Sequence, residues 1–250
     1  MIQFVPESAR VCPAIEDGWP CFLRPGHEAG HRFKQETGEF LARWANGTTA
    51  ADELARWDVE SGVYEAGYTP QPGDTIIDAG AHIGHYTRRA AALVGETGHV
   101  YAFEPEPRNF SLLAKSEGDH IMVFQSALWS EARRLPLILG PSTRGTLQPL
   151  LGGAPIQGTI EVECVTLDML LSNVELTRVD LLKIDVEGAE AELLKGARKL
   201  INTFIPRLVI EIHPIPVGVA DACRELLTDL RYEITPDRPG DNAIWYAEAR

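Results

Sequence analysis

Residues 75–84 read T-I-I-D-A-G-A-H-I-G, and this stretch decides the fold. Three β-branched residues precede an acid, and Gly80 and Gly84 follow in a loop of small residues. The alanine-rich segment Tyr86–Val94 has the composition of a helix. A buried strand, a glycine turn and a helix start bring a nucleotide-like ligand to a sheet edge, because a ligand approaches the backbone closely where no Cβ intervenes. We therefore expect a ligand site at the start of this helix.

Strands and helices alternate along most of the chain that follows. The pattern predicts strands at Thr75–Asp78, His99–Glu104, Ile121–Phe124, Val179–Asp185, Arg207–Ile212, Tyr232–Thr235 and Ala243–Ala247. It predicts helices at Arg108–Lys115, Thr166–Leu171, Ala189–Leu200 and Val219–Leu230. Two further strands, Arg134–Leu139 and Thr159–Val165, flank a Gly/Pro-rich loop at 140–158, whose length is typical of a lid or binding loop. The fold class predicted is α/β, a Rossmann-like doubly wound sheet of about seven strands that closes with an antiparallel pair.

The first part of the chain lacks this regularity. We predict that residues 1–72 form an N-terminal extension or cap and that residues 73–250 form the ligand-binding domain. Prolines and aromatic residues in Val11–Pro25 favour an irregular or short-stranded segment, and helices are expected at Glu28–Ala45 and Thr49–Trp57.

The amino-acid composition argues against some classes of binding partner. The 250 residues carry a net charge of −13, which argues against nucleic acid and against an anionic membrane surface. No apolar run approaches the roughly 18 residues of a membrane helix, and no signal peptide is read at the start. Four scattered cysteines fit a reducing compartment, so a cytoplasmic location is expected.

Three predicted strands end in acids: Asp78, Glu104 and Asp185. In an open α/β sheet the ligand binds outside the carboxyl ends of the strands, near the point where the strand order reverses. Glu104 follows Gly84 by 104 − 84 = 20 residues, the offset at which an acid can bind ribose hydroxyls. We expect the three acids to face one ligand that contains a ribose.

That ribose could belong to NAD or to S-adenosylmethionine. The loop from Gly80 to Gly84 lacks the tight G-x-G of the NAD fingerprint. Asp78 would repel a pyrophosphate but would suit the ammonium group of a methionine moiety. The residues therefore favour S-adenosylmethionine, and a nicotinamide-dependent dehydrogenase stays as the alternative.

At this point the chain resembles the FkbM-type methyltransferases, within the seven-stranded class I S-adenosylmethionine-dependent fold. The resemblance spans about Glu65 to Glu211 and rests on six motifs: D-A-G-A-H-I-G (78–84), V-Y-A-F-E-P (100–105), S-A-L (126–128), T-L-D (166–168), K-I-D-V-E-G-A-E (183–190) and E-I-H (211–213). His82 departs from the family, which usually has Asn there.

The resemblance implies a cofactor site. Its residues here are Glu65, Asp78, Gly80, Ala81, His82, Gly84, Glu104, Pro105, Arg108, Ser126, Ala127 and Asp185. The glycine loop would line the methionine end, and Glu104 would bind the ribose. Ser126 and Ala127 would present to the adenine, and Glu65 would close over the methionine portion.

Asp185, Glu187 and His213 are the candidate catalytic residues. A hydroxyl acceptor must lose its proton to become a good nucleophile, and these three side chains stand at the expected edge of the sheet. His213 has the alternative role of a structural histidine, and Glu190 is expected to complement a helix dipole. No metal ligand is predicted, although Asp185, Glu187, Glu211 and His213 could also gather Mg²⁺.

The sequence thus predicts an O-methyltransferase that acts on a hydroxyl of a small molecule, natural product or sugar. A non-catalytic protein that binds S-adenosylmethionine is a second hypothesis. A nucleic-acid methyltransferase is disfavoured by the charge and by the absence of an N-P-P-Y tetrapeptide. The sequence identifies neither the acceptor nor the oligomeric state.

Overall fold

The fold is taken from a computed structural model of the 250-residue chain. It describes residues 11–12, 21–22, 59, 62–116, 118–139, 145–147, 158–174, 176–213, 216–236 and 244–250. The helices predicted at 28–45 and 49–57, and most of the predicted cap, lie outside these ranges. Strands β1 (Val11–Cys12) and β2 (Cys21–Phe22) pair antiparallel, in agreement with a short-stranded segment.

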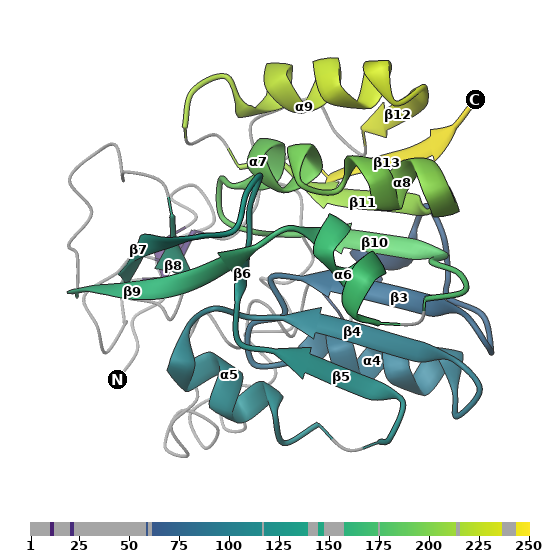
Figure 1. The fold of residues 1–250 in the computed structure, drawn as a ribbon, viewed down its shortest axis with the longest axis horizontal. Helices are drawn as coiled ribbons and strands as arrows, with labels where there is room; N and C mark the ends of the chain where they lie inside the picture. The colour runs from purple at the N-terminus through teal and green to yellow at the C-terminus, as the bar shows by residue number, and fades with distance from the viewer. Residues whose placement is uncertain are drawn as a thin grey trace.

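A seven-stranded sheet forms the centre of the described domain (Figure 1). Its strands, in spatial order, are β12 (Tyr232–Pro236), β13 (Ile244–Ala249), β11 (Arg207–Glu211), β10 (Leu181–Ile184), β3 (Thr75–Ala79), β4 (His99–Phe103) and β5 (Ile121–Phe124). The five strands from β11 to β5 run parallel, and β13 pairs antiparallel with both β11 and β12. The predicted fold class and the closing antiparallel pair are confirmed.

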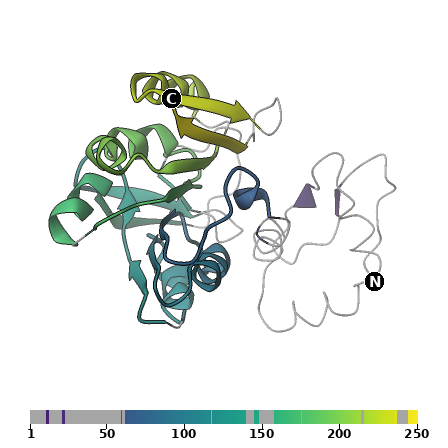
Figure 2. The same cartoon turned by 90° about the vertical axis from the view of Figure 1, so that its right-hand side faces the viewer.

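Helices cover both faces of this sheet, because successive side chains of a strand point to opposite faces. Ile77 belongs to the core that includes side chains of α6 (Leu167–Asn173), α7 (Glu190–Lys195), α8 (Arg198–Phe204) and α9 (Val219–Asp229). Its neighbour Ile76 packs on the other face with α4 (His85–Val94). On that second face Ala102 of β4 packs against Leu113 at the end of α5 (Pro107–Leu113). Figure 2 shows the helices on either side of the sheet.

The strand order reverses between β3 and β10. From β3 the chain moves outward through β4 and β5, and it then returns to place β10 and β11 on the other side of β3. The register pairs Asp78 with Lys183 and Ala79 with Ile184 at the carboxyl ends of the two central strands. This is the position at which open α/β sheets bind their ligands.

A second, four-stranded sheet lies beyond the carboxyl ends of the parallel strands (Figure 1). It contains β6 (Ala127–Leu128), β9 (Gly158–Val165), β7 (Arg133–Leu139) and β8 (Gly145–Thr146), in that order. The chain enters it after β5 and leaves it before β10, so it is an insertion between the two halves of the central sheet. Most of the predicted loop at 140–158 lies outside the described residues.

The single helix predicted at 189–200 is wrong, because the segment forms two helices. α7 ends at Lys195, α8 begins at Arg198, and Gly196 caps the first. A Cβ on Gly196 would lie 2.1 Å from the carbonyl oxygen of Trp129, so the backbone after β6 occupies the space that a side chain would need. This tertiary contact explains why residue 196 is glycine. The contact leaves no periodic pattern in the sequence from which it could have been predicted.

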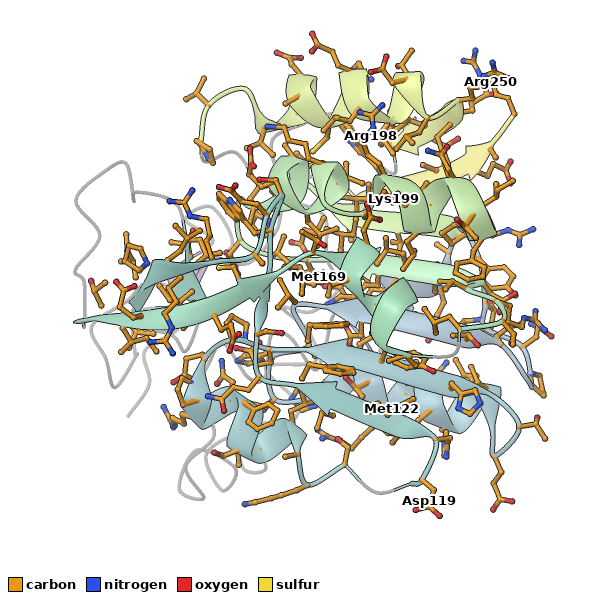
Figure 3. All side chains as sticks on the ribbon, viewed as in Figure 1. Asp119, Met122, Met169, Arg198, Lys199 and Arg250 are labelled. Atoms are coloured by element: carbon orange, nitrogen blue, oxygen red, sulfur yellow. The ribbon has the colours of Figure 1, made fainter. Side chains whose placement is uncertain are left out.

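The outer surface of the described domain carries separate ion pairs. Arg198 on α8 lies 3.8 Å from Asp229, and Arg250 at the end of the chain lies 3.8 Å from Glu233; Figure 3 labels both arginines. Within the described residues, none of the helices has the length and apolar character that a bilayer crossing requires. Cys164 and Cys223 are free, buried thiols.

We predict that Gly196→Ala lowers the free energy of unfolding by about 1–3 kcal/mol, because the added methyl group must displace the Trp129 backbone. Gly158→Ala is the matched control, since nothing lies within 4 Å of a Cβ at that position, and its effect should stay within about 0.5 kcal/mol. Urea unfolding followed by circular dichroism measures both. Equal stability of the two variants would contradict this account of the helix break.

Candidate active site

A buried lysine joins the carboxyl ends of the two central strands. The ammonium nitrogen of Lys183 on β10 lies 3.1 Å from Asp78 Oδ1 on β3 and 3.5 Å from Asp185 Oδ2. The same nitrogen donates a hydrogen bond of 3.0 Å to the carbonyl oxygen of Gly80. Burial alone would lower the pKa of Lys183, but the nearby carboxylates of Asp78 and Asp185 outweigh it and raise that pKa. Lys183 is therefore a fixed cation at the point where the strand order reverses.

The glycine loop after β3 is shaped by its contact with the loop after β10. Gly80 has a φ of 79°, and a Cβ there would lie 1.8 Å from the carbonyl oxygen of Asp185. Only glycine allows the two loops to touch in this way. His82 also lies in the left-handed region, with a φ of 52°, where Asn, Asp and His are the most frequent non-glycine residues. The Asn-to-His departure from the family thus keeps a side chain that this backbone tolerates.

Glu104 follows β4 and holds the glycine loop from the other side. Its carboxylate accepts hydrogen bonds of 2.9 Å from the backbone N–H groups of His82 and Glu106. Burial raises the pKa of Glu104 to about 7, although these two hydrogen bonds and one from Asn109 act in the opposite direction. Glu104 is consequently a buried acid whose charge changes near neutral pH.

A small apolar pocket opens next to the glycine loop. Residues from six segments line it: Gly80, Phe103, Pro105, Ser126, Ala127, Leu128, Leu137, Leu147 and Val186. Leu137 on β7 and Leu147 after β8 come from the inserted sheet, which therefore supplies one wall of the pocket. Of the predicted cofactor residues, Gly80, Pro105, Ser126 and Ala127 meet here.

His213 stands after β11 among three acids. Its Nδ1 lies 2.7 Å from Glu190 Oε1, and its Nε2 lies 3.4 Å from Glu187 Oε2 and 3.8 Å from Asp185 Oδ1. Burial would lower the pKa of His213, but Glu187, Glu190 and Asp185 outweigh it and raise that pKa to about 10. The structure brings the three predicted catalytic residues together around the imidazole.

Glu190 does more than complement a helix dipole, the role expected from the sequence. Its side chain is fully buried, and Oε1 also accepts a hydrogen bond of 3.0 Å from the N–H of Gly188. Glu190 therefore ties the orientation of the His213 ring to the turn after β10.

Glu187 occupies that turn in a strained backbone conformation. Its φ is 50°, and its carbonyl oxygen accepts a hydrogen bond of 2.7 Å from the hydroxyl of Thr146 on β8. Such a conformation persists only where its surroundings hold it, and it is often found at functional sites. The inserted sheet thus contacts the turn that carries a candidate catalytic acid.

The short helix η1 (Val63–Glu65) covers the site from the N-terminal side. The hydroxyl of Tyr64 lies 3.0 Å from Asp185 Oδ2 and 3.1 Å from Glu211 Oε2. Its neighbour Glu65 accepts two hydrogen bonds, of 2.8 and 2.9 Å, from Arg89 on α4. This pair anchors η1 to the domain next to the site.

The sequence prediction and the structure differ on several residues. Asp78 is fully buried, and its partners are Lys183 and Thr87, so the ammonium group beside it comes from the protein itself. Arg108 is exposed at the start of α5 and does not line the pocket. Four residues of the site were not predicted to act in it: Lys183, Glu190, Thr146 and Tyr64. Of these, Lys183 and Glu190 lie at the two ends of the motif at 183–190, which also contains Asp185 and Glu187, and this is a signal that could have been used.

The fold agrees with a solved methyltransferase. The structure of the methyltransferase FkbM from Methylobacillus flagellatus KT superposes with a TM-score of 0.53 at 18% identity, covering 74% of this chain and 46% of that chain. The doubly wound seven-stranded sheet, with acids after its central strands, is the class I methyltransferase fold.

The sequence comparisons identify the family. Residues 78–234, more than half of the chain, match the family described as methyltransferase FkbM domain. The methyltransferase sdnD of Sordaria araneosa is 30% identical, over 65% of this chain and 75% of that protein. The 31-O-demethyl-FK506 methyltransferase FkbM of Streptomyces tacrolimicus is 28% identical, over 58% of this chain and 67% of that protein. The hexuronic acid methyltransferase AglP of Haloferax volcanii is 25% identical, over 56% of each. The chain belongs to the FkbM methyltransferase family.

The raised pKa of Glu104 predicts a specific pH dependence of stability. Since the folded-state pKa of about 7 exceeds the ordinary value of 4.5, the folded protein binds more protons than the unfolded chain between these values. Stability contributed by the protonated carboxyl is therefore complete below pH 4.5 and is lost as the pH rises through 7. Between pH 4.5 and pH 8 the wild type should therefore lose about 3 kcal/mol of unfolding free energy relative to Glu104→Gln. Urea unfolding of both proteins at the two pH values measures this difference. A difference that does not change with pH would contradict the assignment.

Proposed function

We propose that this chain is an S-adenosylmethionine-dependent O-methyltransferase. Glu104 would bind the ribose, and the apolar pocket beside Ser126 and Ala127 would hold the adenine. The glycine loop at 80–84 and the buried Lys183–Asp78 pair would shape the methionine end. When bound, the cofactor supplies an electrophilic methyl group on a sulfonium.

One observation carries this proposal. The Glu104 carboxylate, suited to ribose hydroxyls, adjoins an apolar pocket after β4, and Asp185 follows β10 on the other side of β3, with Glu187 and His213 close to it. An adenosine group and a reacting centre need this separation of an apolar end from a charged end. Purely structural roles would not require two buried and two partly buried ionisable groups, Glu104 and His213 with Asp185 and Glu187, at the open edge of the sheet.

The residues of the chain mainly supply alignment. Methyl transfer is an in-line displacement, so holding the acceptor oxygen opposite the leaving sulfur removes much of the barrier. A hydroxyl acceptor also gives up its proton, and the carboxylates of Asp185 and Glu187, which face the imidazole of His213, would receive it. Tyr64 and Lys183 fix Asp185 Oδ2, which leaves Oδ1 facing the imidazole.

The names of two relatives support the acceptor class that we propose. The name of the Streptomyces protein describes 31-O-demethyl-FK506 as its acceptor, and that of the Haloferax protein describes a hexuronic acid. We propose a hydroxyl of a small molecule or sugar as the acceptor of this chain.

Calorimetric titration tests the cofactor. We expect S-adenosylmethionine and S-adenosylhomocysteine to bind the full chain with micromolar dissociation constants, and NADH not to bind. Glu104→Ala should lose this binding, whereas Glu96→Ala, an exposed acid in the turn before β4, should retain it. Binding of NADH without binding of the sulfur ligands would replace the proposal with a dehydrogenase.

Product analysis tests the acceptor. After incubation with S-adenosylmethionine labelled in its methyl group and a panel of uronic acids and hydroxylated natural products, we expect label in a product that survives mild alkali. A methyl ether survives this treatment, whereas a methyl ester of a carboxyl group is hydrolysed. Glu187→Gln should lower the rate by about 10²–10⁴-fold while the affinity for S-adenosylhomocysteine stays within about threefold. An alkali-labile product would overturn the hydroxyl acceptor, and an unchanged rate would remove Glu187 from the reaction.

A further inference from the structure

We propose that Asp185, Glu187 and His213 bind one divalent cation of the Mn²⁺ type. Each of the three side chains offers one ligand atom, and these atoms all lie within 4.8 Å of one another. The binding of the cation is independent of the methyl-transfer proposal. Its role, holding the acceptor oxygen, rests on the proposed function.

The spacing of the ligand atoms suits a metal better than hydrogen bonds. His213 Nε2 lies 3.4 Å from Glu187 Oε2 and 3.8 Å from Asp185 Oδ1, whereas charged N–H···O bonds measure about 2.7–2.9 Å. Ligand atoms about 2.1 Å from one ion, at tetrahedral or octahedral angles, are separated by about 3.0–3.4 Å. The His213–Glu187 pair already has this separation, and the other two pairs, which lie within 4.8 Å, would close by at most about 1.4 Å around one ion.

The imidazole provides a second, independent indication. His213 is only 8% exposed, and its Nε2 makes no hydrogen bond within the described part of the chain, yet it points at the two carboxylates. A bound cation would take the place of the proton on Nε2, because histidine coordinates a metal through a deprotonated nitrogen. The other nitrogen, Nδ1, lies 2.7 Å from Glu190 Oε1, and metal-binding histidines are held in this manner by a carboxylate on the far side of the ring.

The two carboxylate oxygens of Asp185 face different partners. Oδ2 of Asp185 faces Tyr64 and Lys183, while Oδ1 faces His213. Glu211, part of the Mg²⁺ set considered from the sequence, lies against Tyr64 and does not belong to the three-residue cluster. The set therefore has one nitrogen and two oxygens, a mixture that suits Mn²⁺ and other transition ions better than Mg²⁺ or Ca²⁺, which prefer oxygen alone.

Three protein ligands leave positions for the acceptor. A cation at this cluster would coordinate the acceptor oxygen beside the methyl-transfer centre and would lower the pKa of its hydroxyl group. The strained turn at Glu187, held by Thr146, and the contact between Glu190 and His213 keep the ligands oriented before the ion binds.

Electron paramagnetic resonance of free Mn²⁺ tests the site. We expect MnCl₂ titrated into the chelator-treated full chain to bind at one ion per chain. His213→Gln and Glu187→Gln should each weaken this binding at least about tenfold, and Glu190→Gln should weaken it by about 10–100-fold. Glu192→Gln is the matched control on the same helix, since its carboxylate pairs with Lys195, and it should bind Mn²⁺ as the wild type does.

S-adenosylhomocysteine titrated into the same variants separates the two proposals. Unchanged binding of this ligand shows that the variants are folded. If His213→Gln does not fold, Glu187→Gln still tests the site, because it alters only a partly exposed side chain. A wild type without saturable Mn²⁺ binding, or binding that neither Glu187→Gln nor His213→Gln weakens, overturns the cation site. Loss of S-adenosylhomocysteine binding in the wild type would overturn the cofactor proposal instead, and the Mn²⁺ result would stand.

Discussion

The ion pairs of Lys183 with Asp78 and Asp185 are the interaction on which the site depends. They link the carboxyl ends of the parallel strands β3 and β10, where the chain leaves each strand and enters a loop. The carbonyl of Gly80 accepts from the same ammonium group, so the glycine loop is fixed by the cation as well. A buried pair with one partner removed leaves an uncompensated charge, at a cost of about 3–5 kcal/mol. The charges at the switch point are therefore paired inside the protein.

The two ends of the site have different physical character because different strands supply them. Glu104 after β4 meets an apolar pocket, where burial weakens its acidity. The acids after β10 surround His213 after β11, and each of them faces a basic group. A parallel sheet collects the ends of its strands at one edge, so such unlike environments adjoin without any connection in sequence. This arrangement matches a cofactor with an apolar adenine and a charged centre that transfers its methyl group.

Much of this architecture was predictable from the sequence, because strands buried on both faces leave clear apolar runs that end in acids. The seven strands, the closing antiparallel pair and the meeting of Asp185, Glu187 and His213 all follow from such local patterns. The contacts of Lys183 with Asp78 and Gly80, and of Tyr64 with Asp185, were not predicted because each joins residues more than 100 positions apart in the chain. The break between α7 and α8 escaped for a similar reason, since the backbone of Trp129 makes it necessary. Local pattern predicts elements, whereas buried polar pairs and close backbone contacts arise only when the elements pack.

The inserted sheet links the two ends of the site mechanically. Leu137 and Leu147 form a wall of the apolar pocket, and Thr146, next to Leu147, holds the carbonyl oxygen of Glu187. Pairing of Ile138 with Thr146 makes these residues parts of one small ladder. Because a sheet moves as a unit, any displacement of β7 and β8 changes the pocket wall and the strained turn of Glu187 together. The insertion thus does more than cover the strand ends: it makes the shape of the cofactor pocket and the position of a candidate catalytic acid depend on the same hydrogen-bonded strands.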